Sequence, residues 1–156
     1  MESLVLVLLA WLSANTEFDI SLVPVPNIVE LGPREITLEY YSEYPGRMPA
    51  SGIDERVQAL YSWEDSPHGT IYILGRSFTE PSMSQEQGLN NPLFQERLLH
   101  ELVHHVQYHL GHYDSYECQN EGELQAYLYA GRFLQSQNVS DPLPNRRVLA
   151  HMYSRC

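Results

Sequence analysis

Residues 91–111 read NPLFQERLLHELVHHVQYHLG, and they predict the helix on which the rest of the chain must pack. Asn91 can cap this helix, Pro92 suits its first position, and Gly111 can end it in a left-handed conformation. Its apolar residues recur with helical spacing and form one stripe, which consists of Leu99, Leu102, Val103, Val106 and Leu110. We therefore expect a helix from Pro92 to Leu110 that buries this stripe in the core.

Within this helix the residues His100-Glu101-Leu-Val-His104 spell the pattern HExxH. Two imidazoles four residues apart lie on one helical face, about one turn from each other, so both can reach a single metal ion. The helical period places both histidines at the edge of the core stripe and turns Glu101 slightly further toward solvent. We expect His100 and His104 to be metal ligands and Glu101 to be the general base. The alternative is a pair of ordinary surface histidines.

A catalytic zinc ion keeps three protein ligands and one water, so a third ligand must come from elsewhere. A second helix, expected from about Asn120 to Gln137, offers Glu121 and Glu123. Glu123 shares its face with apolar residues, namely Ala126, Tyr127, Ala130, Phe133 and Leu134. A carboxylate on such a face is costly unless it is paired or binds a metal. We therefore expect Glu123 to be the third ligand, the alternative being a capping box with Asn120.

Three further histidines, His105, His109 and His112, share another face of the metal-binding helix. The helical period places this face roughly opposite the core stripe. We expect solvated surface histidines there, and an adventitious nickel or zinc site is the alternative.

The earlier part of the chain predicts a small, mainly antiparallel sheet. Val57–Trp63 and Thr70–Leu74 are β-prone runs separated by Glu-Asp-Ser-Pro-His-Gly, which is typical of a hairpin. Residues 24–30 read as a short extended segment, and Pro33 can open a helix through Tyr41. Residues 75–91 show no periodicity, and so long a loop is usually functional or mobile. The tail after Asp141 is expected to wrap back over the surface.

Composition argues against two kinds of partner. The chain has 156 residues, 43% of them hydrophobic, which suits a single domain spanning residues 1–156. Its net charge is -11, and its nine positive charges are arginines scattered from Arg34 to Arg155. Binding to nucleic acid requires a basic stripe. Nucleic acid and anionic membrane surfaces are therefore not expected as partners.

The N-terminus and the cysteines bear on localisation. Leu4–Leu12 is an apolar run that is too short to span a bilayer, so no transmembrane segment is expected. It is either the start of a helix ending near Asn15 or the core of a signal peptide. We favour the helix, and with it the cytoplasm, because no positive residue precedes the run. Cys118 and Cys156 are either free thiols or, in an exported protein, a disulfide.

The HExxH motif and the glutamate motif that follows it together resemble those of the gluzincins, which are thermolysin-like metallopeptidases. His100-Glu-Leu-Val-His104 is followed, after eighteen intervening residues, by Glu123-Leu-Gln-Ala-Tyr127. Residues 98–137 are also similar to small bacterial proteins classed as a domain of unknown function. The resemblance implies an α+β, minimal zincin-like fold, in which a small antiparallel sheet packs on the HExxH helix and the glutamate-bearing helix. It also implies that strand Thr70–Leu74 is the sheet edge above the cleft, where an extended peptide could add.

The expected activity is hydrolysis of peptide bonds with one zinc ion per chain and a peptide or protein as substrate. The ion would acidify a water molecule, and Glu101 would take its proton and return it to the leaving amine. Candidate donors to the oxyanion are Tyr108, Tyr113, Tyr116 and Tyr127. The alternatives are a catalytically inactive zinc protein, in which the metal organises the fold or a partner surface, and a hydrolase of a non-peptide amide.

Overall fold

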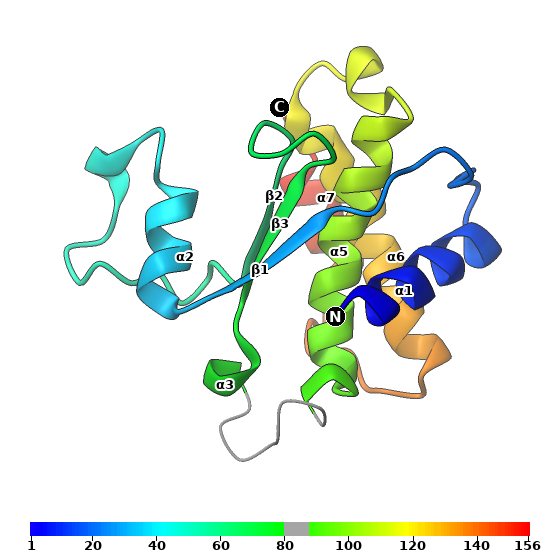
Figure 1. The fold of residues 1–156 in the computed structure, drawn as a ribbon, viewed down its shortest axis with the longest axis horizontal. Helices are drawn as coiled ribbons and strands as arrows, with labels where there is room; N and C mark the ends of the chain where they lie inside the picture. The colour runs from blue at the N-terminus through cyan, green and yellow to red at the C-terminus, as the bar shows by residue number, and fades with distance from the viewer. Residues whose placement is uncertain (80–87) are drawn as a thin grey trace.

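The computed structural model describes residues 1–79 and 88–156, and its central element is helix α5 (Pro92–His109). This helix lies between a sheet and the remaining large helices (Figure 1). The Asn91 side chain accepts a hydrogen bond from the Leu93 amide at 2.8 Å, and Gly111 has a φ of 73°. The predicted boundaries of the helix are therefore confirmed, together with the reasons for them.

Three strands form a mixed sheet in the order β1 (Asn27–Leu31), β3 (Thr70–Leu74) and β2 (Ala59–Ser62). The predicted hairpin is confirmed, because β2 and β3 pair antiparallel. The expectation of a mainly antiparallel sheet is wrong for the other pairing, because β1 and β3 are parallel. Parallel strands need a long crossover connection, and the chain between β1 and β3 supplies one. The fold class is α+β, as expected.

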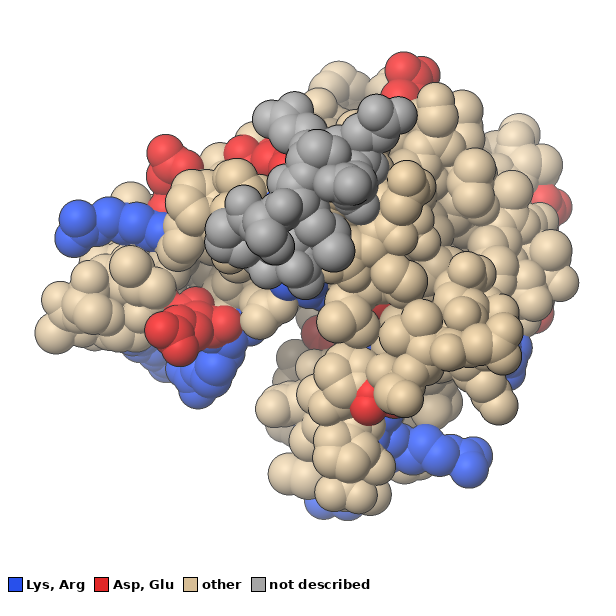
Figure 2. All heavy atoms as spheres, turned by 90° about the horizontal axis from the view of Figure 1, so that it is seen from below, with Lys and Arg blue, Asp and Glu red and all other residues tan. Residues whose placement is uncertain are grey.

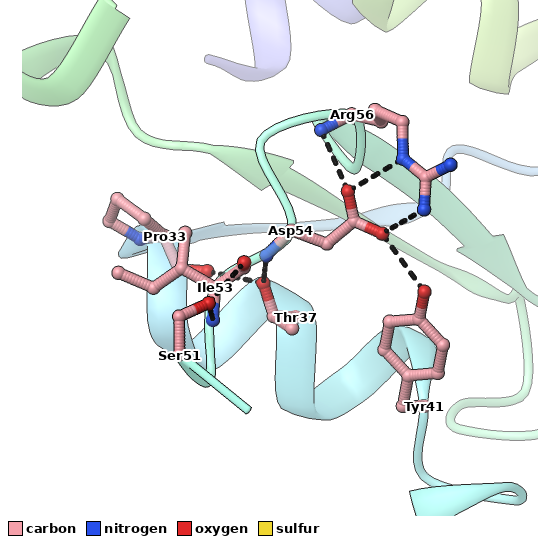
Figure 3. Close-up of polar contacts among 7 residues, drawn as sticks. All are labelled: Pro33, Thr37, Tyr41, Ser51, Ile53, Asp54 and Arg56. Carbon is pink, nitrogen blue, oxygen red and sulfur yellow. Dashed lines mark hydrogen bonds and ion pairs between the residues drawn. The ribbon is translucent and has the colours of Figure 1, made fainter. Parts of the chain in front are cut away.

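One face of the sheet contacts α5 and the other contacts α2 (Pro33–Tyr40) (Figure 1). The segment after α2, which includes the 3-10 turn Pro45–Arg47, is fastened back to the helix through Asp54 (Figure 3). The Asp54 amide donates to Thr37 Oγ1 at 2.9 Å, and the Tyr41 hydroxyl donates to Asp54 Oδ2 at 2.9 Å. These bonds give the segment that leads into β2 a fixed course.

Two helices pack against α5 away from the sheet, α1 (Glu2–Asn15) and α6 (Gly122–Ser136). The predicted first helix is confirmed. The core is formed by buried side chains of α1, α5, α6 and β3, among them Leu8, Leu12, Ile71, Ile73, Leu98, Leu99, Leu102, Val106, Ala126 and Ala130. No described helix is long and apolar enough to cross a membrane.

The connections differ from the expectations in two places. Short helix α3 (Arg76–Thr79) occupies part of the segment expected to lack structure, of which residues 80–87 lie outside the described part of the chain. The tail forms helix α7 (Arg146–Tyr153), which the sequence did not predict and which packs on α6. Short 3-10 turns, His112–Ser115 and Gln119–Glu121, join α5 to α6, and Cys118 forms a disulfide with Cys156.

Candidate metal centre

The three side chains expected to bind metal meet between α5 and α6. His100 Nε2 lies 3.3 Å from His104 Nε2 and 3.2 Å from Glu123 Oε2. His104 Nε2 lies 3.6 Å from Glu123 Oε1. The structure therefore places two imidazole nitrogens and a carboxylate at the corners of a small triangle.

The size of this triangle fits a tetrahedral metal ion. Zinc bound at about 2.0–2.1 Å from nitrogen and oxygen ligands would set those atoms about 3.3 Å apart. Among the described residues, one other group has potential ligand atoms within 4.8 Å of one another, and it consists of Glu117, Glu121 and Cys156. Its cysteine is part of the disulfide and is not a thiolate ligand. The histidine–glutamate triangle is thus the group with the chemistry of a transition-metal site.

Close packing of the two helices brings Glu123 to the histidines. A Cβ atom on Gly122 would lie 2.7 Å from Gln107 Oε1 and 3.3 Å from His104 Nδ1, so a glycine is needed for this approach. The next residue, Glu123, then faces the histidines. No side-chain cap is present at the start of α6, so the capping-box alternative is wrong. Glu121 is directed elsewhere, because its carboxylate accepts a hydrogen bond from the Glu117 amide at 2.7 Å.

The orientation of His104 is fixed from behind by Gln107, a residue that the sequence analysis did not single out. Gln107 is fully buried, and its amide nitrogen donates to Gly122 O and to Gln125 Oε1 at 3.0 and 2.9 Å. Its oxygen is thus the acceptor for His104 Nδ1–H, at 3.1 Å. This tautomer leaves the Nε2 lone pair directed at the triangle. The sequence feature that could have indicated this role is the position of the glutamine, three residues after the second histidine of the motif.

Glu101 is more buried than its position on the helix suggested. The residue is 8% exposed, although it still lines the cleft in front of the triangle. Burial raises the pKa of Glu101 above its usual value. The prediction that Glu101 turns toward solvent was wrong because it considered the core stripe alone, whereas the elements around α5 cover several of its faces. Glu101 is beside the triangle and is not one of its three corners.

The expectation that His105 is solvated was also wrong, for the same reason. The sheet and the segment before it cover this face of α5, and His105 is fully buried. Its Nε2–H donates to Pro24 O at 2.7 Å, and its Nδ1 lies 3.3 Å from the Tyr61 hydroxyl. Burial lowers the pKa of His105 to about 4. It is a neutral core residue, while His109 and His112 are half-buried.

A cleft of about 1130 Å³ opens in front of the triangle. One wall is formed by residues 53–61, and the opposite wall by α5, α6 and the start of α7. In Figure 2 the surface is hollowed between the part that holds α2, on the left as in Figure 1, and the helical body. Of the four tyrosines considered as oxyanion donors, Tyr113 and Tyr127 line this cleft, and Tyr108 and Tyr116 do not.

Two arginine-centred networks hold the walls of the cleft in place. Arg146 at the start of α7 is buried, with Nη1 2.8 Å from Glu96 Oε1 and Nε 2.6 Å from Asp141 Oδ2. On the other wall, Arg56 pairs with Asp54 and keeps the pKa of that carboxyl well below its usual value (Figure 3). Neither network is predicted by the sequence, because the partners lie on separate elements or in a loop without periodicity.

The edge of the sheet beside this cleft is β2. The expectation that Thr70–Leu74 forms the edge is wrong, because β3 is the middle strand. The Leu74 amide donates a hydrogen bond to the carbonyl oxygen of the opposite residue, Gln58, at 2.8 Å. In an antiparallel pair every second residue is hydrogen-bonded to the neighbouring strand, so Leu60 and Ser62 also direct their backbone groups at β3. The backbone groups of Ala59 and Tyr61 then point to the open edge, and both residues line the cleft.

Comparison with known proteins identifies no relative. No family model, no curated protein and no solved structure matches this chain. The function must therefore be inferred from the residues of the cleft.

Proposed function

We propose that this chain is a zinc-dependent peptidase of the gluzincin type, with a minimal zincin-like fold and one zinc ion held by His100, His104 and Glu123. The observation that carries the proposal is the triangle of His100, His104 and Glu123. Its two Nε2 atoms lie 3.3 Å apart, and they lie 3.2 and 3.6 Å from Oε2 and Oε1 of the Glu123 carboxylate, spacings that suit one tetrahedral ion. Three protein ligands leave a fourth position, and the cleft gives a substrate access to it.

When bound, zinc supplies a water molecule that is acidic near neutral pH and a Lewis acid for the substrate carbonyl. Glu101 is the general base in this proposal. It lies within the cleft beside the ligands without being one of them, so it can accept a proton and return it to the leaving amine. Gln107 keeps His104 in the tautomer that binds metal.

Tyr127 is the candidate donor to the oxyanion. It follows Glu123 by one helical turn, lines the cleft, and packs its ring against His100 with centroids 4.8 Å apart. Its hydroxyl makes no hydrogen bond to any residue in the described part of the chain. Tyr113 is less suited to this role, because its hydroxyl lies 3.3 Å from His104 Nδ1, on the side of the ring away from Nε2.

The open edge of β2 favours an extended peptide as the substrate. The outward backbone groups of Ala59 and Tyr61 lie at the same cleft as the triangle, and a peptide strand could pair with them. Main-chain pairing of this kind gives affinity without requiring a particular sequence, so a peptide suits this site better than a small amide.

The proposal is tested with a broad peptide library and zinc-loaded protein, with and without a chelator. We expect one zinc ion per chain, cleavage by the parent, and loss of cleavage on chelation. Glu101→Gln should keep the zinc and lose turnover by about 10²–10⁴-fold or more, because proton transfer and metal binding use different residues. Normal turnover in Glu101→Gln would refute the mechanism. Protein that binds zinc and cleaves nothing would instead be a zinc-binding structural or partner-binding protein.

A further inference from the structure

Aromatic side chains gather at the end of the cleft where α5 finishes. Tyr61 of β2, Trp63 just after β2 and Tyr113 of the 3-10 turn His112–Ser115 all line the cleft. The rings of Trp63 and Tyr113 have centroids 6.0 Å apart, and Tyr108 stacks behind Trp63 at 5.7 Å without lining the cleft. The Tyr113 hydroxyl lies 3.3 Å from the ring of the ligand His104, so this cluster adjoins the triangle directly.

We propose that Tyr61, Trp63 and Tyr113 form a subsite for an aromatic side chain of the substrate, on the amino-terminal side of the bond that is cleaved. The inference rests on the proposed function and adds to it the class of residue that the protein selects.

The direction of the substrate peptide in the cleft follows from the course of β2 along α5. Near its start, the side chain of Gln58 accepts a hydrogen bond from Arg97 Nη1 at 2.6 Å, and Arg97 precedes the motif histidines. Just past its end, Trp63 stacks on Tyr108, near the end of α5. A peptide that pairs antiparallel with β2, the more stable pairing per residue, runs the opposite way. Its amino-terminal part therefore lies at Trp63, and its carboxyl-terminal part lies toward Gln58.

The chemistry of the three lining residues favours an aromatic side chain of the substrate. Tyr61 is half-buried, its hydroxyl is directed at His105 at 3.3 Å, and burial raises its pKa. The neighbouring Asp65 accepts a hydrogen bond from Tyr72 at 3.3 Å, away from the three lining rings. Edge-to-face and offset-stacked contacts with such rings stabilise a further aromatic ring beyond the area that is buried. An arginine side chain could stack there through cation–π contacts, so the test includes it.

The test measures binding, so that it does not depend on turnover. The protein is zinc-loaded Glu101→Gln, and the probes are blocked hexapeptides of alanine in which one central residue is Ala, Phe, Arg or Asp. By calorimetry we expect the Phe peptide to bind roughly tenfold more tightly than the all-Ala peptide, and the Arg and Asp peptides to gain nothing comparable. Trp63→Ala should remove the tenfold advantage. Phe78→Ala, which alters an aromatic residue elsewhere in the same cleft, should retain it.

A second readout needs no change to the cluster. The chain has two tryptophans, so Trp11→Phe leaves Trp63 as the one tryptophan fluorophore. Its emission should change when the Phe peptide binds and stay constant with the all-Ala peptide. Equal affinity for all probes, tighter binding of the Arg peptide, or an advantage for Phe that survives Trp63→Ala would overturn the subsite.

Cleavage products separate this inference from the proposed function. If the parent cleaves peptides, the aromatic residue should be the last residue of the amino-terminal product, and an aromatic residue at the start of the other product would overturn the direction. If the parent cleaves nothing, the peptidase proposal fails, while the binding ratios with and without Trp63→Ala still decide whether the aromatic subsite exists.

Discussion

At the scale of single residues, two glutamates that lie close together in the sequence are directed to different places. Glu123 faces His100 and His104, whereas Glu121 is held by the backbone of Glu117. In the proposed site Glu123→Ala would leave two ligands, so we expect zinc affinity to fall strongly and thermal stability to stop responding to added zinc. Glu121→Ala should keep the zinc and cost only about 0.3–1 kcal/mol of stability.

The measurement is metal content and melting temperature, with and without zinc, for both variants beside the parent. The pair is well matched, because the two residues have the same chemistry and lie two positions apart. Zinc lost with Glu121→Ala and kept with Glu123→Ala would contradict the assignment of the third ligand.

Sequence reasoning succeeded for those residues whose placement depends on one helix at a time. The spacing of His100 and His104, and the position of Glu123 on its own apolar face, follow from the helical period. It failed for Glu101 and His105, because their burial depends on which distant elements cover α5. A helical wheel assumes one buried face, whereas α5 is covered by the sheet on one side and by α1 and α6 on others.

The approach of α6 to α5 depends on a residue without a side chain. A methyl group at Gly122 would lie 2.7 Å from Gln107 Oε1 and 3.3 Å from His104 Nδ1, so the buried Gln107 side chain or one of the two helices must move. We expect Gly122→Ala to destabilise the fold by about 1–3 kcal/mol and to weaken zinc binding, because the shift displaces Gln107, which orients His104, or Glu123. Gly46→Ala is the control, since no atom lies within 4 Å of the added methyl group.

Denaturant unfolding and zinc titration of these two variants provide the measurement. Gly46→Ala should stay within about 0.5 kcal/mol of the parent. Parental stability together with parental zinc affinity in Gly122→Ala would mean that the two helices do not approach each other as closely as described.

At the scale of elements, helix α7 is an example of an element that local sequence patterns do not predict. Capping residues marked the ends of α5, and two β-prone runs separated by a turn sequence indicated the β2–β3 hairpin, so both were predicted. Helix α7 is held instead by Arg146, whose carboxylate partners Glu96 and Asp141 are distant or in a loop. The parallel pairing of β1 was missed similarly, because its partner β3 lies some forty residues later in the chain.

The Arg146 network can be tested against the adjacent arginine. Arg146→Met leaves the carboxylate of Glu96, which is 8% exposed, without this partner, so we expect a loss of about 3–5 kcal/mol. Arg147→Met removes the same charge from the same helix at an exposed position and should cost less than about 0.5 kcal/mol. Equal unfolding free energies for the two variants would show that the buried pairs do not stabilise α7.

The disulfide acts at the scale of the whole molecule, because it joins the end of the chain to the loop that leads into α6. The sequence left open whether Cys118 and Cys156 pair, and the structure shows them bonded across a separation of 38 residues. Closing a loop of this length reduces the entropy of the unfolded chain and stabilises the fold by about 4 kcal/mol. In the proposed function, zinc would stabilise the same fold differently, by binding the folded state.

The two contributions should therefore be separable in one experiment on the oxidised and reduced protein, each with zinc or with chelator. Reduction should lower the unfolding free energy by about 4 kcal/mol in both metal states. Chelation should lower it further in both redox states, because the triangle consists of side chains on α5 and α6, which contact each other directly. The double variant Cys118→Ser and Cys156→Ser is the control, and it should match the reduced parent and stay insensitive to reductant. If reduction abolished zinc binding altogether, the triangle would depend on the anchored tail, and packing between α5 and α6 alone would not be sufficient to hold Glu123 at the histidines.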